Sequence, residues 1–119
     1  MGKILIVDDD KGIGEMLQML LEMNDHQVSV SDNPNETNKN ILNQGIDLVL
    51  LDKLISGVDG IDVCTQVKNN EKTKHVRVLM MSALHEAERK CKNAGADDFI
   101  AKPFEIDELL EKVNELLEN

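Results

Sequence analysis

The sequence predicts an α/β protein in which one open, parallel β-sheet carries helices on both faces. Short apolar runs recur along the chain, near residues 4–7, 28–30, 48–51, 76–81 and 99–101. Most of these runs are continuous, which is typical of parallel strands that are buried on both faces. Between the runs, apolar residues repeat at helical spacing. Strands that alternate with helices, joined by right-handed crossovers, favour this layered architecture, although the pattern alone leaves the order of the strands open.

The first two helices are predicted from spacing and from turn residues. Over residues 13–21, apolar side chains recur at the spacing of one helix face, which predicts an amphipathic helix. Asn33 and Pro34 then form an N-cap followed by a first-turn proline, so we expect the second helix to begin there. It reaches about Gln44, where Gly45 ends it.

The remaining helices follow the same reasoning. The spacing over 61–67 indicates a helix after the third strand, and the spacing over 106–117 indicates a helix at the C-terminus. A fourth helix is expected over 84–94, with Leu84 in its apolar stripe and Gly95 just past its end.

Length, charge and cysteine spacing limit the functions that this chain can have. We expect residues 1–119 to form one domain that needs no disulfide or zinc framework, with Cys64 and Cys91 as small core residues. Because 13 Lys and Arg stand against 23 Asp and Glu, a net charge of −10, direct binding of nucleic acid is not expected. The apolar runs are too short to span a bilayer and no signal peptide is recognisable, so we expect a cytoplasmic protein without a membrane segment.

Polar side chains follow the predicted strands at the ends where open α/β sheets bind their ligands. These side chains are Asp8, Asp9 and Asp10 after the first strand, Asp52 after the third, Ser82 after the fourth and Lys102 after the fifth. If the first and third strands are neighbours, the aspartates that follow them converge on one small volume.

This group of carboxylates has two interpretations. Asp9 or Asp10 alone could simply cap the next helix. However, two carboxylates roughly 4 Å apart repel by about 4 kcal/mol at an effective dielectric constant near 20, so such a cluster either raises its pKa values or holds a hard divalent cation such as Mg²⁺. A metal beside a carboxylate, a lysine and a hydroxyl suits phosphoryl transfer, in which a carboxylate can itself be the nucleophile. Asp52 is the candidate by position.

Four segments of the chain, in this order, resemble the receiver domain of two-component response regulators. The segments are 4–10, which ends in three aspartates, 47–60 with Asp52 and Gly57-Val58-Asp59-Gly60, Met80-Met81-Ser82-Ala83, and 95–104 with Lys102-Pro103. The resemblance covers essentially the whole chain. It implies a single-domain, doubly wound (βα)5 sandwich of the flavodoxin-like type, with a five-stranded parallel sheet in the order 2-1-3-4-5.

The resemblance also implies that Asp52 receives a phosphoryl group from the phosphohistidine of a sensor histidine kinase or of a phosphotransfer protein, with Mg²⁺ or Mn²⁺ as the cofactor. Asp9 and Asp52 would be direct metal ligands. Asp8 would act through water, and the backbone carbonyl of Leu54 would complete the set of ligands. Lys102 would pair with a phosphoryl oxygen. Beyond magnesium-dependent self-phosphorylation and self-dephosphorylation, no enzyme activity is expected.

Two further residues match the switch positions of the family. Ser82 stands where a Ser or Thr hydroxyl moves to bond the phosphoryl group, and Phe99 stands where an aromatic residue, more often tyrosine, swings inward. Phe99 also fits an ordinary core position. These residues connect the site to the face of the fourth helix, fifth strand and fifth helix, which is the expected output surface. The partner there would be an unidentified downstream protein or an output domain absent from this chain, and the family allows a dimer that depends on phosphorylation.

Three residues depart from the family pattern in ways that affect the chemistry. Ser56 replaces the usual proline, so the loop over 52–60 lacks a fixed φ and we expect it to be more mobile. Leu54 and Leu84 stand at positions that flank the site and tune the phosphoryl lifetime in the family. Because neither leucine readily orients an attacking water, we expect slow self-hydrolysis of the phosphoryl group. The dipeptide Lys102-Pro103 keeps the family pattern, in which this bond is usually cis.

Three other functions remain open at this point. A haloacid-dehalogenase-type phosphatase also uses an Asp-x-Asp strand end, and its nucleophile would be Asp8. Its other motifs are imitated by Ser82, Lys102 and the Asp97-Asp98 pair. A flavodoxin-like cofactor binder is disfavoured, because three carboxylates after the first strand would repel a flavin phosphate. The last alternative is a receiver that binds partners without being phosphorylated.

Overall fold

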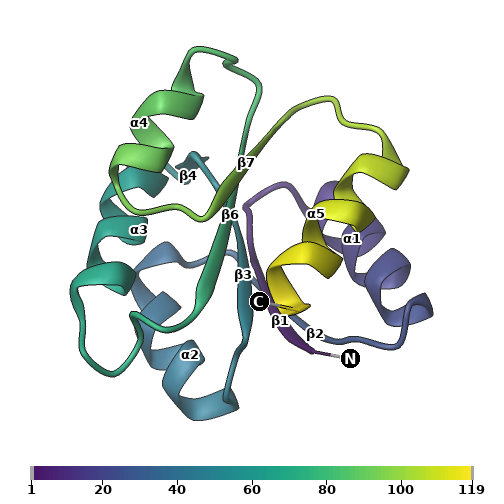
Figure 1. Ribbon diagram of the computed structural model, residues 1–119, viewed down its shortest axis with the longest axis horizontal. Helices are drawn as coiled ribbons and strands as arrows, with labels where there is room; N and C mark the ends of the chain where they lie inside the picture. Colours follow the sequence, from purple (N-terminus) through teal and green to yellow (C-terminus); the bar gives the residue numbers. More distant parts are fainter. Residues whose placement is uncertain (1, 119) are drawn as a thin grey trace.

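In the computed structural model, which describes residues 2–118, one sheet of parallel strands lies between two layers of helices (Figure 1). The sheet has five strands in the order β2-β1-β3-β6-β7, and every pairing is parallel. The strands are β1 (Lys3–Val7), β2 (Gln27–Ser31), β3 (Leu48–Asp52), β6 (Arg77–Ser82) and β7 (Asp98–Ala101). Counted along the main sheet this order is 2-1-3-4-5, so the predicted fold class is confirmed.

The helices divide between the two faces of the sheet (Figure 1). On one face lie α1 (Lys11–Met23) and α5 (Ile106–Glu118), and on the other lie α2 (Thr37–Gln44), α3 (Gly60–Asn69) and α4 (Ala87–Asn93). Within residues 2–118, none of the helices combines the length and the hydropathy that a bilayer crossing requires.

Alternate side chains of each strand enter two separate hydrophobic clusters. On β1, Ile4 and Ile6 pack with Leu17 of α1, whereas Leu5 and Val7 pack in the cluster on the opposite face. This alternation is the normal period of two of a strand. Because helices cover both faces, every position of such a strand needs an apolar residue, which explains the continuous apolar runs.

The helix boundaries agree with the sequence except at two starts. A short 3-10 helix, η1 (Pro34–Glu36), precedes α2, and the Asn33 side chain caps it by accepting the Asn35 N–H at 3.0 Å. The expected start of the fourth helix at Leu84 is wrong, since α4 begins at Ala87. Instead, the Leu84 N–H donates to the Ser82 hydroxyl at 3.0 Å and the Leu84 side chain is exposed.

One further element was not expected from the sequence. The strands β4 (Leu54–Ile55) and β5 (Val58–Asp59) pair antiparallel in a small hairpin between β3 and α3. The segment that we expected to be a loop without a fixed φ therefore has a defined backbone pairing. Ser56 and Gly57 form its turn.

Candidate functional site

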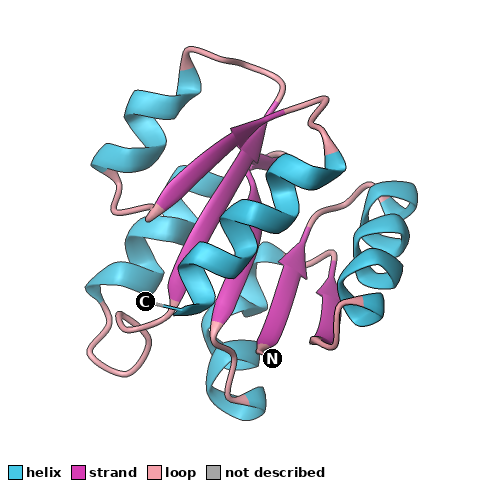
Figure 2. Ribbon diagram, turned by 45° about the vertical axis from the view of Figure 1, so that its right-hand side comes forward, coloured by secondary structure: helices cyan, strands magenta, loops and turns pink. Residues whose placement is uncertain are grey.

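The carboxyl ends of the parallel strands lie together at one edge of the sheet, where the arrowheads point the same way in Figure 2. At this edge β1 and β3 are direct neighbours, with Val7 in register with Leu51. The next residues along the two strands are Asp8 and Asp52. Adjacent parallel strands therefore bring two acids side by side that are distant in the sequence.

Three carboxylates form one cluster at this edge. Ligand oxygens of Asp8, Asp9 and Asp52 all lie within 4.8 Å of one another. Their exposure differs, since Asp8 is only 2% exposed, Asp52 is partly buried and Asp9 is exposed. The cluster thus reaches from the protein interior to the solvent.

Lys102, which follows the edge strand β7, brings one positive charge to the cluster. Its Nζ lies 3.1 Å from Oδ2 of Asp8 and 3.5 Å from Oδ1 of Asp52. The residue directly follows β7, and its bond to Pro103 is cis, as the resemblance implied. One ammonium group offsets only one of the three negative charges.

The surroundings of Asp52 change its acidity. Burial raises the pKa of the Asp52 carboxyl above its ordinary value, the positive charge of Lys102 opposes this change, and the negative charge of Asp8 adds to it. A raised pKa makes the ionised carboxylate less stable and more basic than a carboxylate in water.

The three consecutive aspartates after β1 have different roles. Asp10 caps α1, because its Oδ1 accepts the Ile13 N–H at 3.1 Å. The Asp10 N–H in turn donates to Oδ1 of Asp8 at 2.9 Å and holds that carboxylate in place. The capping interpretation therefore holds for Asp10, whereas Asp8 and Asp9 turn into the cluster.

The other residues predicted for the site come from β4, β6 and β7. Asp52 is in register with Met81 on β6, so the buried Ser82 stands one position further along the neighbouring strand. Phe99 of β7 is buried in the cluster of side chains that also includes Ala87 of α4. Leu54 begins the small hairpin, and its side chain is exposed.

One contact to the cluster was missed by the sequence analysis. The backbone N–H of Ser56, in the hairpin turn, donates to Oδ2 of Asp9 at 2.7 Å. The departure from the usual proline carried the relevant signal, because any other residue at this position has an N–H to donate.

The donor set fits a hard divalent cation. Mg²⁺ binds oxygen ligands, uses one or two carboxylates and keeps several waters. The carboxylates of Asp8, Asp9 and Asp52 supply such oxygens within a few ångströms, and they carry more negative charge than Lys102 neutralises. Mg²⁺ or Mn²⁺ would therefore be held by residues that otherwise repel one another.

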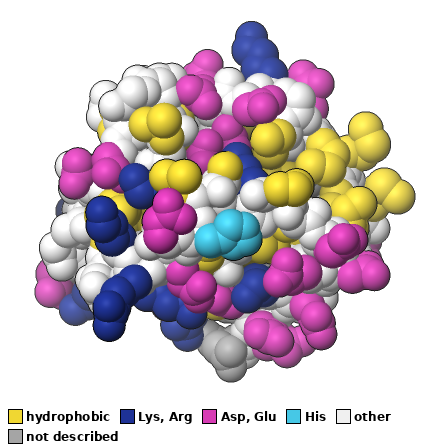
Figure 3. All heavy atoms as spheres, turned by 90° about the horizontal axis from the view of Figure 1, so that it is seen from above, with side chains coloured by type: hydrophobic (Ala, Val, Ile, Leu, Met, Phe, Trp, Pro, Cys, Tyr) yellow, Lys and Arg dark blue, Asp and Glu magenta, His cyan; other side chains and the backbone are white. Residues whose placement is uncertain are grey.

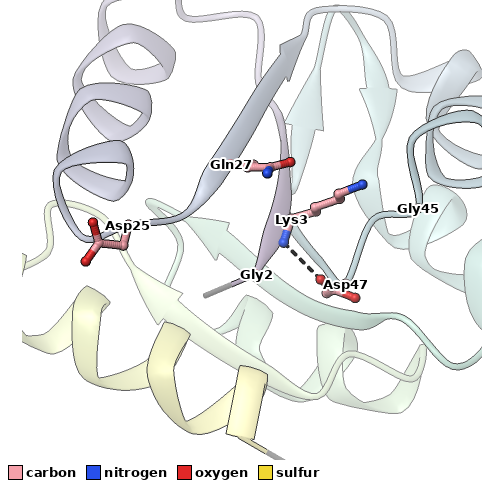
Figure 4. A pocket seen from close by; sticks show the side chains of 6 residues that line it. All are labelled: Gly2, Lys3, Asp25, Gln27, Gly45 and Asp47. Carbon is pink, nitrogen blue, oxygen red and sulfur yellow. Dashed lines mark hydrogen bonds between the residues drawn. The ribbon is translucent and has the colours of Figure 1, made fainter.

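A separate hollow of about 340 Å³ lies at the opposite edge of the sheet, where the strands begin (Figure 4). It is lined by Gly2, Lys3, Asp25, Gln27, Gly45 and Asp47. The Lys3 N–H donates to Oδ2 of Asp47 at 2.9 Å, while the Asp25 carboxylate points away from that pair (Figure 4). The groups that line this hollow do not converge on a common point.

The geometry disfavours the phosphatase alternative. Asp97 and Asp98 stand where β7 begins, whereas Lys102 follows its end. Asp97 pairs with Lys68 at 2.7 Å and with Arg77 at 3.4 Å, at the edge away from the acidic cluster. The pair that imitates a phosphatase motif is therefore occupied in a structural network.

Comparison with known proteins agrees with this geometry. The family model described as "Response regulator receiver domain" matches residues 4–114. The chain is 34% identical over 119 residues to the DNA-binding dual master transcriptional regulator RpaA of Synechocystis sp., covering 98% of this chain and 49% of that protein. It is 36% identical over 117 residues to the transcriptional regulatory protein ResD of Bacillus subtilis, covering 97% of this chain and 48% of that protein.

A solved structure gives the same result. The crystal structure of a putative response regulator from Chloroflexus aurantiacus superposes with a TM-score of 0.93 at 32% identity, covering 99% of this chain and 98% of that one. The chain spans about half the length of the curated relatives that it matches. By sequence, by fold and by the arrangement of its acidic edge, this chain belongs to the family of response regulator receiver domains of two-component signalling.

Proposed function

We propose that Asp52 accepts a phosphoryl group from the phosphohistidine of a sensor histidine kinase or of a phosphotransfer protein. One observation carries this proposal: the carboxylates of Asp8, Asp9 and Asp52 lie within 4.8 Å of one another, with the Lys102 ammonium beside them. In the transfer, a carboxylate oxygen of Asp52 bonds to phosphorus while the P–N bond of the donor breaks. The imidazole nitrogen keeps the electron pair of that bond.

Four residues of this chain would hold the divalent cation. Asp9 and Asp52 are the proposed direct ligands, Asp8 acts through a water molecule, and the carbonyl oxygen of Leu54 contributes from the hairpin. Bound Mg²⁺ or Mn²⁺ supplies positive charge that neutralises the oxygens of the transferring group. The close approach of the carboxylates supports this assignment, because the cation removes their mutual repulsion.

Lys102 has a related role at the other side of the phosphoryl group. Its ammonium already lies 3.5 Å from Oδ1 of Asp52, so a short movement of a flexible side chain would bring it to a phosphoryl oxygen. An added phosphoryl group carries a charge of about −1.5 to −2 at neutral pH. Lys102 therefore offsets charge that appears only when Asp52 is modified.

The proposed output surface consists of α4, β7 and α5. Asp98 of β7 links these elements, because it pairs with Lys112 of α5 at 3.2 Å and with Lys92 of α4 at 3.9 Å. Ser82 and Phe99 are the proposed switch residues that connect this surface to Asp52. The Ser82 hydroxyl accepts the Leu84 N–H, and its own hydrogen can be donated to a phosphoryl oxygen.

The proposed phosphodonor surface lies beside Lys102. An apolar hollow of about 320 Å³ is lined by Ile13, Met16, Ala83, Lys102, Pro103 and Phe104. Figure 3 looks onto this end of the molecule and has hydrophobic side chains gathered on the side of α1 and α5. A partner that covers this hollow brings its phosphohistidine next to the acidic cluster.

The remaining proposals concern the whole protein. We propose that residues 1–119 form one receiver domain, since the two hydrophobic clusters together draw on elements from β1 to α5 and share the strands of one sheet. Its chemistry would be limited to self-phosphorylation and self-dephosphorylation, and its output would pass to a downstream protein or to a further domain. The cytoplasm is the proposed location, in keeping with two free buried thiols, Cys64 and Cys91.

The test is to incubate the protein with Mg²⁺ and acetyl phosphate and to map the modified residue by mass spectrometry. We expect one phosphoryl group on Asp52 and none on Asp52→Asn. Asp47→Asn is the matched control, because Asp47 precedes the same strand at the opposite edge and lies outside the cluster. The control should be phosphorylated like the wild type.

Two results would overturn the proposal. Label on Asp8, with rapid turnover of an aryl phosphate, would identify a phosphatase instead. No label on any residue, with either acetyl phosphate or a phosphohistidine protein, would identify a partner-binding receiver that is not phosphorylated.

A further inference from the structure

The β4–β5 hairpin is closed by a tight turn of two residues. Ile55 pairs with Val58, so Ser56 and Gly57 are the two turn residues between them. Both have positive φ, +50° at Ser56 and +81° at Gly57. A two-residue hairpin with positive φ at both positions is a type I′ turn. A proline at position 56 could not form it, because its ring fixes φ near −65°.

This turn directs a backbone donor at one carboxylate of the acidic cluster. The Ser56 N–H donates to Oδ2 of Asp9 at 2.7 Å, and the Ser56 hydroxyl lies 3.4 Å from the same oxygen. Asp9 is the exposed member of the cluster, so its side chain would otherwise move freely in solvent. The N–H occupies one carboxylate oxygen and leaves the other available for a cation.

The hairpin that carries Ser56 is anchored to the rest of the domain. The Ile55 side chain is completely buried in the core. Asp59 caps α3 by accepting the Ile61 N–H at 2.9 Å, and it pairs with Lys53 at 3.6 Å. The Ser56 N–H is therefore a donor in a fixed position.

We infer that Ser56 is a positioning residue of the divalent-cation site. Its backbone N–H holds the carboxylate of Asp9 in the orientation that binds the cation. This inference rests on the proposed role of Asp9 as a metal ligand. Hydrogen bonds to ligating carboxylates orient them, and the loss of such a partner typically lowers metal affinity by about 10- to 100-fold. In this chain the bond exists because the residue is not proline, and it also ties the segment that carries Leu54 to Asp9.

The test compares Ser56→Pro with Ser56→Gly by calorimetric titration of the unphosphorylated proteins with MgCl₂. Proline removes both the N–H and the positive φ, whereas glycine keeps both and removes only the hydroxyl. We expect Ser56→Pro to bind Mg²⁺ roughly 10-fold more weakly and Ser56→Gly to bind it within about 2-fold of the wild type. Equal affinity of the two variants would overturn the inference.

Asp9→Asn separates the failure of this inference from the failure of the proposed function. If Asp9→Asn binds Mg²⁺ as tightly as the wild type, Asp9 is not a ligand and the proposed metal site is wrong. If Asp9→Asn binds weakly while Ser56→Pro and Ser56→Gly bind alike, the metal site stands and the role of Ser56 is overturned.

A measurement on the wild type applies even if Ser56→Pro fails to fold. Amide hydrogen exchange, followed by NMR, reports the Ser56 N–H directly. We expect slow exchange without Mg²⁺ and slower exchange with saturating Mg²⁺, because the cation then fixes Asp9 as well. Fast exchange of the Ser56 N–H in the Mg²⁺-bound protein would contradict the inference.

Discussion

The Nζ of Lys102 lies 3.1 Å from Oδ2 of Asp8, although 94 positions separate the two residues in the sequence. Asp8 is almost completely buried and Lys102 is largely buried. A buried carboxylate that loses its cation is costly, because little water replaces the lost partner. Removing Lys102 should therefore lower the stability of the folded protein as well as change the proposed phosphorylation site.

Lys102→Met is expected to destabilise the protein by roughly 3 kcal/mol in metal-free buffer, since it leaves Asp8 without its cation. Lys112→Met is the matched control, because Lys112 pairs with Asp98 at 3.2 Å where both side chains are more exposed, and it should cost about 1 kcal/mol or less. Urea unfolding followed by circular dichroism measures both variants. If both variants lose the same free energy of unfolding, the buried Lys102–Asp8 pair contributes no more to stability than the more exposed Lys112–Asp98 pair.

Asp52→Asn is expected to stabilise the metal-free protein at neutral pH. Burial raises the pKa of Asp52, so the folded state binds this proton more tightly than the unfolded chain does. The cost of ionising Asp52 is therefore absent below its ordinary pKa and is fully present above its raised pKa. The free energy of unfolding of Asp52→Asn should exceed that of the wild type by roughly 1 kcal/mol at pH 7.

Comparing Asp52→Asn with the wild type at several pH values tests the direction of the pKa shift of Asp52. The advantage of Asp52→Asn should shrink as the buffer is acidified toward the ordinary pKa of an aspartate, about 3.9, because the folded wild type takes up its proton before the unfolded chain does. Urea titrations at several pH values give the difference directly. An advantage that grows on acidification would mean that the pKa of Asp52 is lowered instead.

Adding Mg²⁺ should raise the stability of the wild type, because a ligand that binds only the folded state stabilises it. At a free concentration 100 times the dissociation constant, the gain is about 2.7 kcal/mol. EDTA should remove the gain, and Asp9→Asn should lose most of it. Thermal unfolding followed by circular dichroism suits this chain, which has no Trp and no Tyr for fluorescence. A gain of the same size in Asp9→Asn would exclude that residue as a ligand.

Gly60→Ala is expected to destabilise the protein by roughly 2 kcal/mol or more. A Cβ at Gly60 would overlap the carbonyl oxygen of Asp52 and lie 3.0 Å from Cα of Lys53. The substitution should therefore also displace Asp52 and lower the rate of its phosphorylation.

Gly12→Ala is the control for that substitution. A Cβ at Gly12 would lie 3.4 Å from its nearest neighbour, an oxygen of Asp10, and alanine is the better helix former in α1. Gly12→Ala should raise the free energy of unfolding by roughly 0.5 kcal/mol. If both variants lose stability equally, the close contact at Gly60 is not the cause.

The phosphoryl group on Asp52 is expected to last for minutes or longer, because the exposed side chains of Leu54 and Leu84 do not orient an attacking water. Leu84→Gln should shorten this lifetime several-fold, on the order of 1 kcal/mol in the barrier. Leu42→Gln, at a similarly exposed leucine of α2, should leave it unchanged. Loss of the phosphoryl mass over time measures the rates, and decay of the wild type within seconds would contradict the expectation.

The sheet and the helices were predictable because their residues obey strong local rules. Ile4 to Val7 are all apolar because both faces of β1 are covered, and Gly45 and Gly95 end their helices with positive φ. The order of the strands was not available from these patterns. It came from the resemblance to the receiver family, and the structure confirms it.

The features that were missed depend on hydrogen bonds from single backbone N–H groups to side-chain oxygens. The Ser56 N–H reaches Asp9 from a turn in which Ser56 has a positive φ, and the residue type does not indicate that conformation. Leu84 fits a helical stripe by spacing, but the Ser82 hydroxyl holds its N–H in a turn. The proximity of Asp8, Asp9 and Asp52 was foreseen, while the roles assigned to them stay predictions.

The position of Lys102 also bears on the synthesis of the protein. The ribosome releases the acids of β1 and β3 well before it releases β7 and the lysine that follows. A partly made copy therefore lacks the ammonium group that pairs with Asp8 and Asp52, and it lacks β7, one of the two edge strands of the sheet. Under the proposed chemistry, the ammonium group that offsets the phosphoryl charge on Asp52 becomes available only after residue 102 has left the ribosome.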